Sequence, residues 1–92
     1  MKDDPEVVAT VFELARYLRA NPLACDAPDG IRRWWLPFPP AAMEKLLMAL
    51  ERMKELGLIE ETCAADGRVR YRRIASDQAL DALGSAGPWT MH

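Results

Sequence analysis

The sequence has few of the side chains that build catalytic and metal sites. Its 92 residues include two cysteines, Cys25 and Cys63, and one histidine, at the final position. Two isolated cysteines do not give the ligand spacing of a zinc site. Without a histidine inside the chain, general acid–base catalysis near neutral pH would need a strongly shifted carboxyl group. We therefore expect no enzyme and no cofactor, and we expect both cysteines to be reduced and half-buried.

Long apolar runs and phosphate-cradling glycine loops are also missing. The apolar runs are far shorter than the roughly 18 residues that a membrane-spanning helix needs. The first five residues lack the basic start and apolar stretch of a secretory signal. We expect one cytoplasmic domain over 1–92 that does not associate with a membrane. Its ordered core should cover about 5–83, and 84–92 should be a frayed tail.

Charge is distributed unevenly along the chain. The formal net charge is −2, so the whole chain is no polycation. Residues 1–30 carry three basic and six acidic groups, whereas 31–57 carry five basic and three acidic groups. The last eighteen residues, 75–92, contain two acids and neither lysine nor arginine. Positive charge therefore collects in the middle of the chain.

Three helices are predicted within the first 56 residues. The first, over 5–20, has apolar residues at three- and four-residue steps, an N-cap at Asp4, and a stop at Asn21 before proline. A short second helix should cover 29–36, and the longest helix about 40–56. The buried stripe of the longest helix should hold Met43, Leu46, Leu47, Leu50, Met53 and Leu56.

A β-hairpin is predicted after the third helix. Gly57 suits a helix C-terminus, and Asp66-Gly67 is a strong turn signal between strands at 58–63 and 68–74. Residues 23–25 fit either a short strand or coil. A further short helix should begin at Ser76 or Asp77 and run through Leu83. The shared core should contain Leu14, Leu18, Leu46, Leu50, Met53, Leu56 and Leu58.

The return strand has an irregular pattern. Val69 and Tyr71 share one face, the next position on that face is Arg73, and Ile74 falls on the other face. Either a bulge shifts the register after Tyr71, or Ile74 lies past the ladder. Arg73 is then expected near solvent at the base of the hairpin. Acids on the facing strand, Glu60 and Glu61, are available to pair with the arginines.

The segment from Leu50 to Ile59, followed by Asp66-Gly67-Arg68 and Tyr71-Arg72, resembles the winged helix-turn-helix domain of bacterial transcriptional regulators. The resemblance covers about 5–75. It implies an α+β, mostly helical fold, with three helices and a two-stranded β-hairpin wing. It also implies double-stranded DNA as the partner and a dimeric regulator, with the third helix in the major groove.

The resemblance places candidate DNA contacts on three elements. The outward face of the third helix would hold Ala41, Glu44, Lys45, Met48, Glu51 and Arg52. Glu44 and Glu51 there oppose binding to phosphates. Alternating residues of the wing would present further cations on one face, and the second helix would add more. The predicted nucleic-acid-binding residues are Lys45, Arg52, Arg68, Arg70, Arg72, Arg32 and Arg33.

The adjacent tryptophans support a second interpretation. Trp34 and Trp35 lie about 100° apart on a helix, so both cannot face one core. One should fill the core beside Leu14 and Leu50, while the other lies half-exposed. The exposed indole, with nearby apolar side chains, would form a patch for a protein partner or a homodimer. The predicted partner-binding residues are Trp34, Trp35, Phe38 and Met48.

Overall fold

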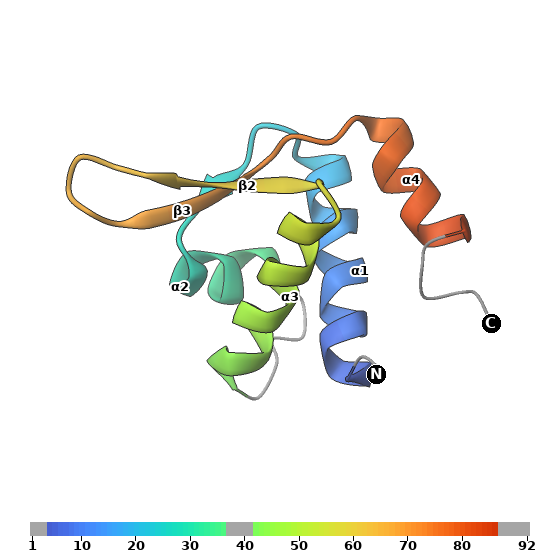
Figure 1. Cartoon of the computed structure of the whole chain (residues 1–92), viewed down its shortest axis with the longest axis horizontal. Helices are drawn as coiled ribbons and strands as arrows, with labels where there is room; N and C mark the ends of the chain where they lie inside the picture. The colour runs from blue at the N-terminus through green and yellow to red at the C-terminus, as the bar shows by residue number, and fades with distance from the viewer. Residues whose placement is uncertain (1–3, 37–41, 87–92) are drawn as a thin grey trace.

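The computed structural model describes residues 4–36 and 42–86, and these form an α+β, mostly helical fold (Figure 1). The helices are α1 (Pro5–Ala20), α2 (Pro28–Gly30), α3 (Met43–Glu55) and α4 (Asp77–Ala86), and a π-helical turn, η1 (Ile31–Trp35), continues α2. The strands are β1 (Cys25–Asp26), β2 (Ile59–Cys63) and β3 (Val69–Arg73). The predicted class is confirmed, while the expected two-stranded hairpin belongs to a three-stranded sheet.

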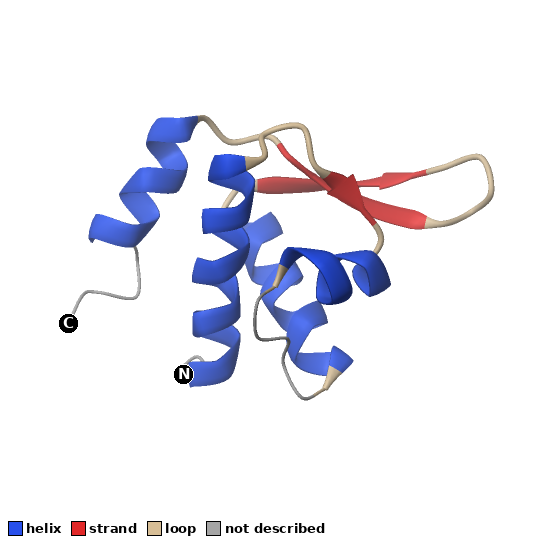
Figure 2. Cartoon of the chain, turned by 180° about the vertical axis from the view of Figure 1, so that it is seen from behind, coloured by secondary structure: helices blue, strands red, loops and turns tan. Residues whose placement is uncertain are grey.

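The first helix has the predicted bounds, and local chemistry explains both ends. Asp4 accepts a hydrogen bond from the Glu6 amide at 2.8 Å, and Pro5 occupies the first turn, where a missing amide proton costs nothing. The helix ends at Asn21, whose amide donates to the Tyr17 carbonyl. The helix packs against α3, and Figure 2 shows the two helices from behind.

The second helical segment depends on a close contact between Asp26 and Gly30. A Cβ at Gly30 would lie 2.2 Å from an Asp26 carboxylate oxygen, so a larger residue there would displace the Asp26 side chain. The following turn widens into η1 and separates the two indoles. Trp35 is buried and stacks on Tyr17 with ring centroids 4.9 Å apart, whereas Trp34 is 70% exposed. The predicted division of the two tryptophans between core and solvent is confirmed.

Two glycines form the turns of this region: one between α3 and the hairpin, and one within the hairpin itself. Gly57 has φ +74°, and the Leu58 amide donates across it to the Met53 carbonyl at 3.0 Å. Gly67 has φ +84° in the turn between β2 and β3. The structure confirms a helix that stops near Gly57 and a hairpin across Asp66-Gly67. Residues 40 and 41 of the predicted helix lie outside the described ranges.

The sheet is antiparallel with the order β1-β3-β2. Its pairing runs one to one from Ile59 opposite Arg73 to Cys63 opposite Val69. No bulge shifts this ladder, and Ile74 lies past it with 53% of its surface exposed. Of the two interpretations of 23–25, a short strand is present, since Cys25 pairs with Arg72. Both cysteines are exposed, which corrects the expectation that they are half-buried, because each lies on an outer strand of the sheet.

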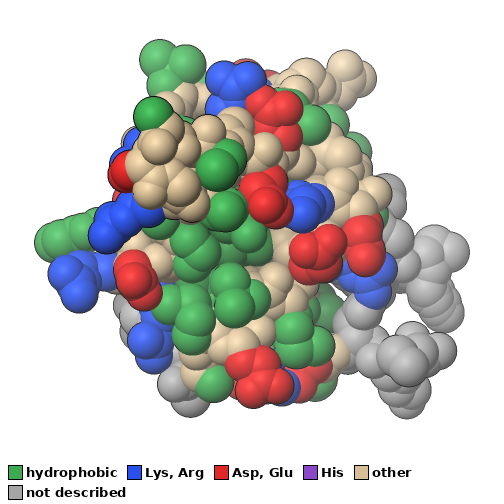
Figure 3. Space-filling view, turned by 60° about the vertical axis from the view of Figure 1, so that its left-hand side comes forward, with side chains coloured by type: hydrophobic (Ala, Val, Ile, Leu, Met, Phe, Trp, Pro, Cys, Tyr) green, Lys and Arg blue, Asp and Glu red, His purple; other side chains and the backbone are tan. Residues whose placement is uncertain are grey.

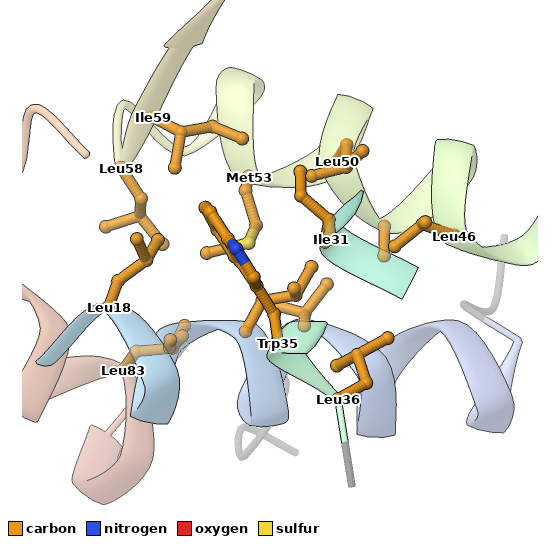
Figure 4. Packing of buried hydrophobic residues seen from close by; sticks show 14 of the residues in the cluster. Leu18, Ile31, Trp35, Leu36, Leu46, Leu50, Met53, Leu58, Ile59 and Leu83 are labelled. Carbon is orange, nitrogen blue, oxygen red and sulfur yellow. The ribbon is translucent and has the colours of Figure 1, made fainter. Parts of the chain in front are cut away.

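One core joins α1, η1, α3, α4 and the base of the hairpin (Figure 4). The indole of Trp35 lies between α1 and α3, close to Met53. Most predicted core residues are buried, but Leu56 is only partly so. Leu47 corrects the predicted stripe of α3, because 44% of its surface is exposed. The buried side chains are Val7, Val11, Leu14, Ala15, Leu18, Ile31, Trp35, Leu36, Leu46, Ala49, Leu50, Met53, Leu58, Ile59, Leu80 and Leu83.

Arg73 corrects a second expectation, since it is largely buried instead of near solvent. Only 10% of its side chain is exposed. Its guanidinium donates to the Leu18 carbonyl at 3.1 Å, to the Ala75 carbonyl at 2.6 Å, and to Asp77 at 2.6 Å. The Leu18 carbonyl belongs to the last turn of α1, where a cation is favourable. Arg73 therefore ties the sheet to α1 and α4.

The last helix begins where the sequence predicts and extends further. The Ser76 hydroxyl accepts a hydrogen bond from the Ala79 amide at 3.1 Å, which caps the first turn of α4. The helix then continues to Ala86, so residues 84–86 are helical and not part of a frayed tail. The rest of the predicted tail, 87–92, lies outside the described ranges.

Candidate interaction surface

A hollow of about 480 Å³ lies where α2, α3 and the hairpin turn meet. Figure 3 turns this side of the molecule toward the reader and shows hydrophobic side chains gathered in the middle of the face, with acidic and basic side chains around them. The walls are built from three segments that are far apart in the sequence. The lining residues are Asp26, Ala27, Pro28, Asp29, Gly30, Met43, Leu47, Arg68 and Val69.

Exposed apolar side chains also lie near this hollow. On α3, Leu47 lines it, and Met48, the next residue and about 100° further around the helix, is 47% exposed on the outer side. On the other wall, Gly30 lines the hollow and Trp34 follows four residues later, about one helical turn along the same side. We call the hollow together with Leu47, Met48 and Trp34 the α2–α3 surface. Phe38, which was expected in this patch, lies outside the described residues.

The outermost line of α3 is acidic. Glu44, Met48, Glu51 and Glu55 recur at steps of three and four residues, so they form one line along the helix. All four are exposed, while the buried residues of α3 occupy the opposite side. A phosphate backbone placed against this line would meet three carboxylates, of which Glu51 and Glu55 lie 3.5 Å and 3.4 Å from the cations of Lys54 and Arg52.

Lys45 and Arg52 lie on the flank of α3 that faces α1. Lys45 forms an ion pair with Asp4, and this hydrogen bond raises the pKa of the lysine and lowers the pKa of the Asp4 carboxyl. Arg52 is seven residues further, nearly two full turns, and therefore lies on the same flank. Its guanidinium contacts Glu55 at 3.4 Å.

Lys54 lies on the flank of α3 that faces the hairpin. Its ammonium donates to Glu61 on β2 at 2.7 Å and lies 3.5 Å from Glu51. The hydrogen bond to Glu61 is the main reason that the pKa of Lys54 is raised. Lys54 thus links α3 to the sheet, because its ammonium contacts a carboxylate on each of these two elements.

The hairpin arginines differ in what they contact. Arg72 pairs with Glu60 directly across the ladder. Arg70 lies opposite Thr62, and the Arg68 backbone amide donates to Asp66 at 2.9 Å in the turn. Among the residues that the structure describes, the guanidinium groups of Arg68 and Arg70 form no ion pair. These two arginines are the available cations of the hairpin.

The seven predicted DNA contacts do not share one strip of α3 and hairpin. Lys45 and Arg52 lie on the α1 flank of α3, whereas Arg68 lines the hollow on the opposite flank, beside Leu47. The acidic line runs between the two groups. Of the arginines of η1, Arg33 is exposed and Arg32 is half-buried.

Sequence patterns did not reveal the hollow. Its lining comes from α2, α3 and the hairpin turn, and no local motif reports how such segments meet. One signal for the exposure of Leu47 was present in the sequence. Leu47 lies three residues after Glu44 and four before Glu51, so it borders the polar side of the helix.

Comparisons with known proteins give no indication of function, which is therefore inferred from the surface. No family model, curated protein or solved structure matches this chain. Within the described residues, no group of three or more His, Cys, Asp or Glu side chains is arranged to hold a metal ion. Across 4–36 and 42–86, no helix is both long and apolar enough to cross a bilayer.

Proposed function

We propose that this chain is a winged-helix module that binds another protein through the α2–α3 surface. Three helices followed by a hairpin agree with the order of elements expected for such a fold. The observation that carries the proposal is the cluster of exposed apolar side chains around the hollow. Exposed aromatic and methionine side chains next to a concave site are typical of the centre of protein–protein interfaces.

The composition of this surface fits a protein–protein interface. Trp34 is 70% exposed, and tryptophan is among the residues that most often dominate binding energy. Leu47 adds apolar area on the facing wall, and Met48 adds flexible apolar area on the outer side of α3. Charged groups surround the apolar centre, as expected of an interface rim.

Double-stranded DNA is the second candidate, and Arg68 and Arg70 are the observation that favours it. Arg68 is exposed beside the hairpin turn and Arg70 is half-buried on β3, and guanidinium groups near a wing tip are suited to phosphate contacts. The acidic line of α3 opposes this role, because phosphate binding depends on cations at the contact. Protein binding is therefore the better-supported function.

The protein-binding role is tested by photo-crosslinking in the cells that produce the chain. A photoreactive amino acid replaces Met48 in one variant and Arg16 in a control variant. Arg16 is more accessible than Met48, with 77% of its side chain exposed, but lies on α1. We expect a defined protein adduct from position 48 that position 16 does not give. Identical adduct patterns from both positions would contradict a partner at the α2–α3 surface.

The DNA role is tested by titrating a random-sequence duplex at about 50 mM salt, where nonspecific contacts are strong. The protein-binding proposal predicts no measurable duplex binding. If binding is found, the double variant Arg68→Ala with Arg70→Ala decides its origin. A fall of about two in the slope of log K against log salt would assign two phosphate contacts to the hairpin and overturn the proposal.

A further inference from the structure

We propose that the partner element that occupies the α2–α3 surface is a basic amphipathic helix, with one or more of its apolar side chains in the hollow. This inference rests on the proposed function and specifies the chemistry of the partner. It follows from three features of the hollow: its size and apolar walls, the charges around it, and its position between two helices.

The hollow accepts apolar groups of side-chain size. Its volume of about 480 Å³ falls within the range of about 300–1,000 Å³ that is usual for ligand sites in proteins. Apolar side chains form walls on all three sides: Pro28 on α2, Met43 and Leu47 on α3, and Val69 on β3. Burying a leucine or phenylalanine here would remove apolar surface of both partners from water.

The charges around the hollow select a basic partner. Asp26 and the exposed Asp29 line the hollow, and Glu44 is exposed on the α3 side, whereas Glu51 lies 3.5 Å from the Lys54 ammonium. Among the described lining residues, the single cation is Arg68, at the hairpin end. Lysine or arginine side chains of the partner would therefore lie over the two helices, and an acidic side chain would suit the end near Arg68.

The position of the hollow between two helical segments suits a helical partner. A helix that presents apolar residues at i, i+3, i+4 and i+7 places them in one row. Such a row can contact Leu47 and Met48 on α3 and reach Trp34 on η1. An extended strand would instead be recognised along an open sheet edge, and the hollow meets the sheet only at Asp26, the last residue of the two-residue edge strand β1, and at Val69, the first residue of β3.

The probe is a synthetic 18-residue helical peptide with a leucine stripe and lysines on its other faces. A second peptide keeps the leucines and replaces every lysine with glutamate. A third keeps the lysines and replaces every leucine with alanine. Titration followed by fluorescence anisotropy should give saturable binding of the first peptide to the full chain. The second and third should bind at least about tenfold more weakly, a loss of roughly 1.4 kcal/mol.

Matched variants locate the binding site. Leu47→Ser removes an apolar group of the hollow, whereas Ile74→Ser removes an equally exposed apolar group elsewhere, with 44% and 53% of the two residues exposed. We expect Leu47→Ser to weaken peptide binding about tenfold and Ile74→Ser to change it less than about twofold. Circular dichroism verifies folding, and Met48→Ser repeats the test if Leu47→Ser is unfolded.

Charge reversal tests the choice of a basic partner. Asp29→Lys should weaken binding of the lysine peptide and strengthen binding of the glutamate peptide. Equal binding of the lysine and glutamate peptides would overturn the inference, and so would equal effects of the two serine variants. A homodimer that Leu47→Ser dissociates, without peptide binding, would instead identify a second copy as the occupant.

The two proposals fail in different ways. A specific crosslink at position 48 combined with weak binding of the lysine peptide would retain the protein-binding function and reject a basic helix as the partner. Identical crosslinks at positions 48 and 16, or duplex binding through Arg68 and Arg70, would reject the function itself.

Discussion

The two ends of the hairpin use the same residue types for different purposes. At its base, Arg73 is buried and donates to two backbone carbonyls and one carboxylate. At its far end, Arg68 and Arg70 remain available to solvent. The difference shows that the charge of a strand arginine does not indicate its role. Arg73 stabilises the junction of the sheet, α1 and α4, whereas the other two are candidates for contacts outside the chain.

The same contrast holds along the facing strand. Ile59, at the base of β2, is 3% exposed and packs in the core. Thr62, near the turn, is half-buried, and its hydroxyl lies 3.4 Å from the Arg70 carbonyl. The base of the hairpin is therefore part of the folded core, and the far end extends away from it (Figure 1).

The largest expected effect comes from truncating the base. Ile59→Ala should reduce the free energy of unfolding by about 2–5 kcal/mol, because it leaves a cavity in a filled core. Thr62→Ala, three residues along the same strand, should cost less than about 1 kcal/mol. Urea unfolding followed by circular dichroism measures both values. Equal losses would mean that core packing extends to the far end of the hairpin.

A smaller effect is expected for the arginines. Arg73→Met keeps much of the apolar length of the side chain but leaves the Leu18 and Ala75 carbonyls without their donor. A loss of about 2–3 kcal/mol is expected, the size of one or two charge-assisted hydrogen bonds at about 1.5–3 kcal/mol, because Asp77 is 56% exposed and is hydrated when the arginine is removed. Arg70→Met is the matched control and should change stability by less than about 0.5 kcal/mol. Equal losses for the two variants would contradict the different roles assigned to them.

The sequence predicted the elements well because their signals are local. The periodicity of α1, Gly57 at the end of α3 and Asp66-Gly67 in the hairpin each act within one or two turns of chain. Arg73 could not be placed this way, since its partners include a carbonyl fifty-five residues earlier. A strand pattern shows on which face of the sheet a side chain lies. Whether that face meets solvent or a helix terminus depends on the positions of the ends of α1 and α4.

The candidate site was predictable in composition but not in arrangement. The exposure of one tryptophan follows from two adjacent indoles on one helix, and the structure agrees. The separation of Lys45 from Arg68 depends on which flank of α3 faces α1, and that is set by the packing of the whole core. The hollow beside Leu47 likewise arises only when α2, α3 and the hairpin turn come together.

The smallest expected effect concerns acid pH and also separates Arg73 from Arg70. The hydrogen bond from Arg73 is the main reason that the pKa of Asp77 lies below its ordinary value, and Arg19 lowers that pKa further. A carboxyl group whose pKa is lower in the folded state stabilises the fold above its unfolded pKa of about 3.9. That contribution disappears as the pH falls through the folded pKa, because the unfolded state binds the proton first. Asp77 is 56% exposed, so solvent screens the effect.

Urea unfolding between about pH 5 and pH 2.5 measures this contribution. In Arg73→Met the dependence of stability on pH below about 4 should be weaker than in the wild type, with a remainder due to Arg19 and to the Asp4–Lys45 pair. Arg70→Met should retain the wild-type dependence, because Arg70 lies on the strand face away from Asp77. If Arg70→Met weakens the dependence of stability on acid pH as much as Arg73→Met does, the effect reflects net charge alone. The contrast between the base of the hairpin and its far end would then not extend to their electrostatics.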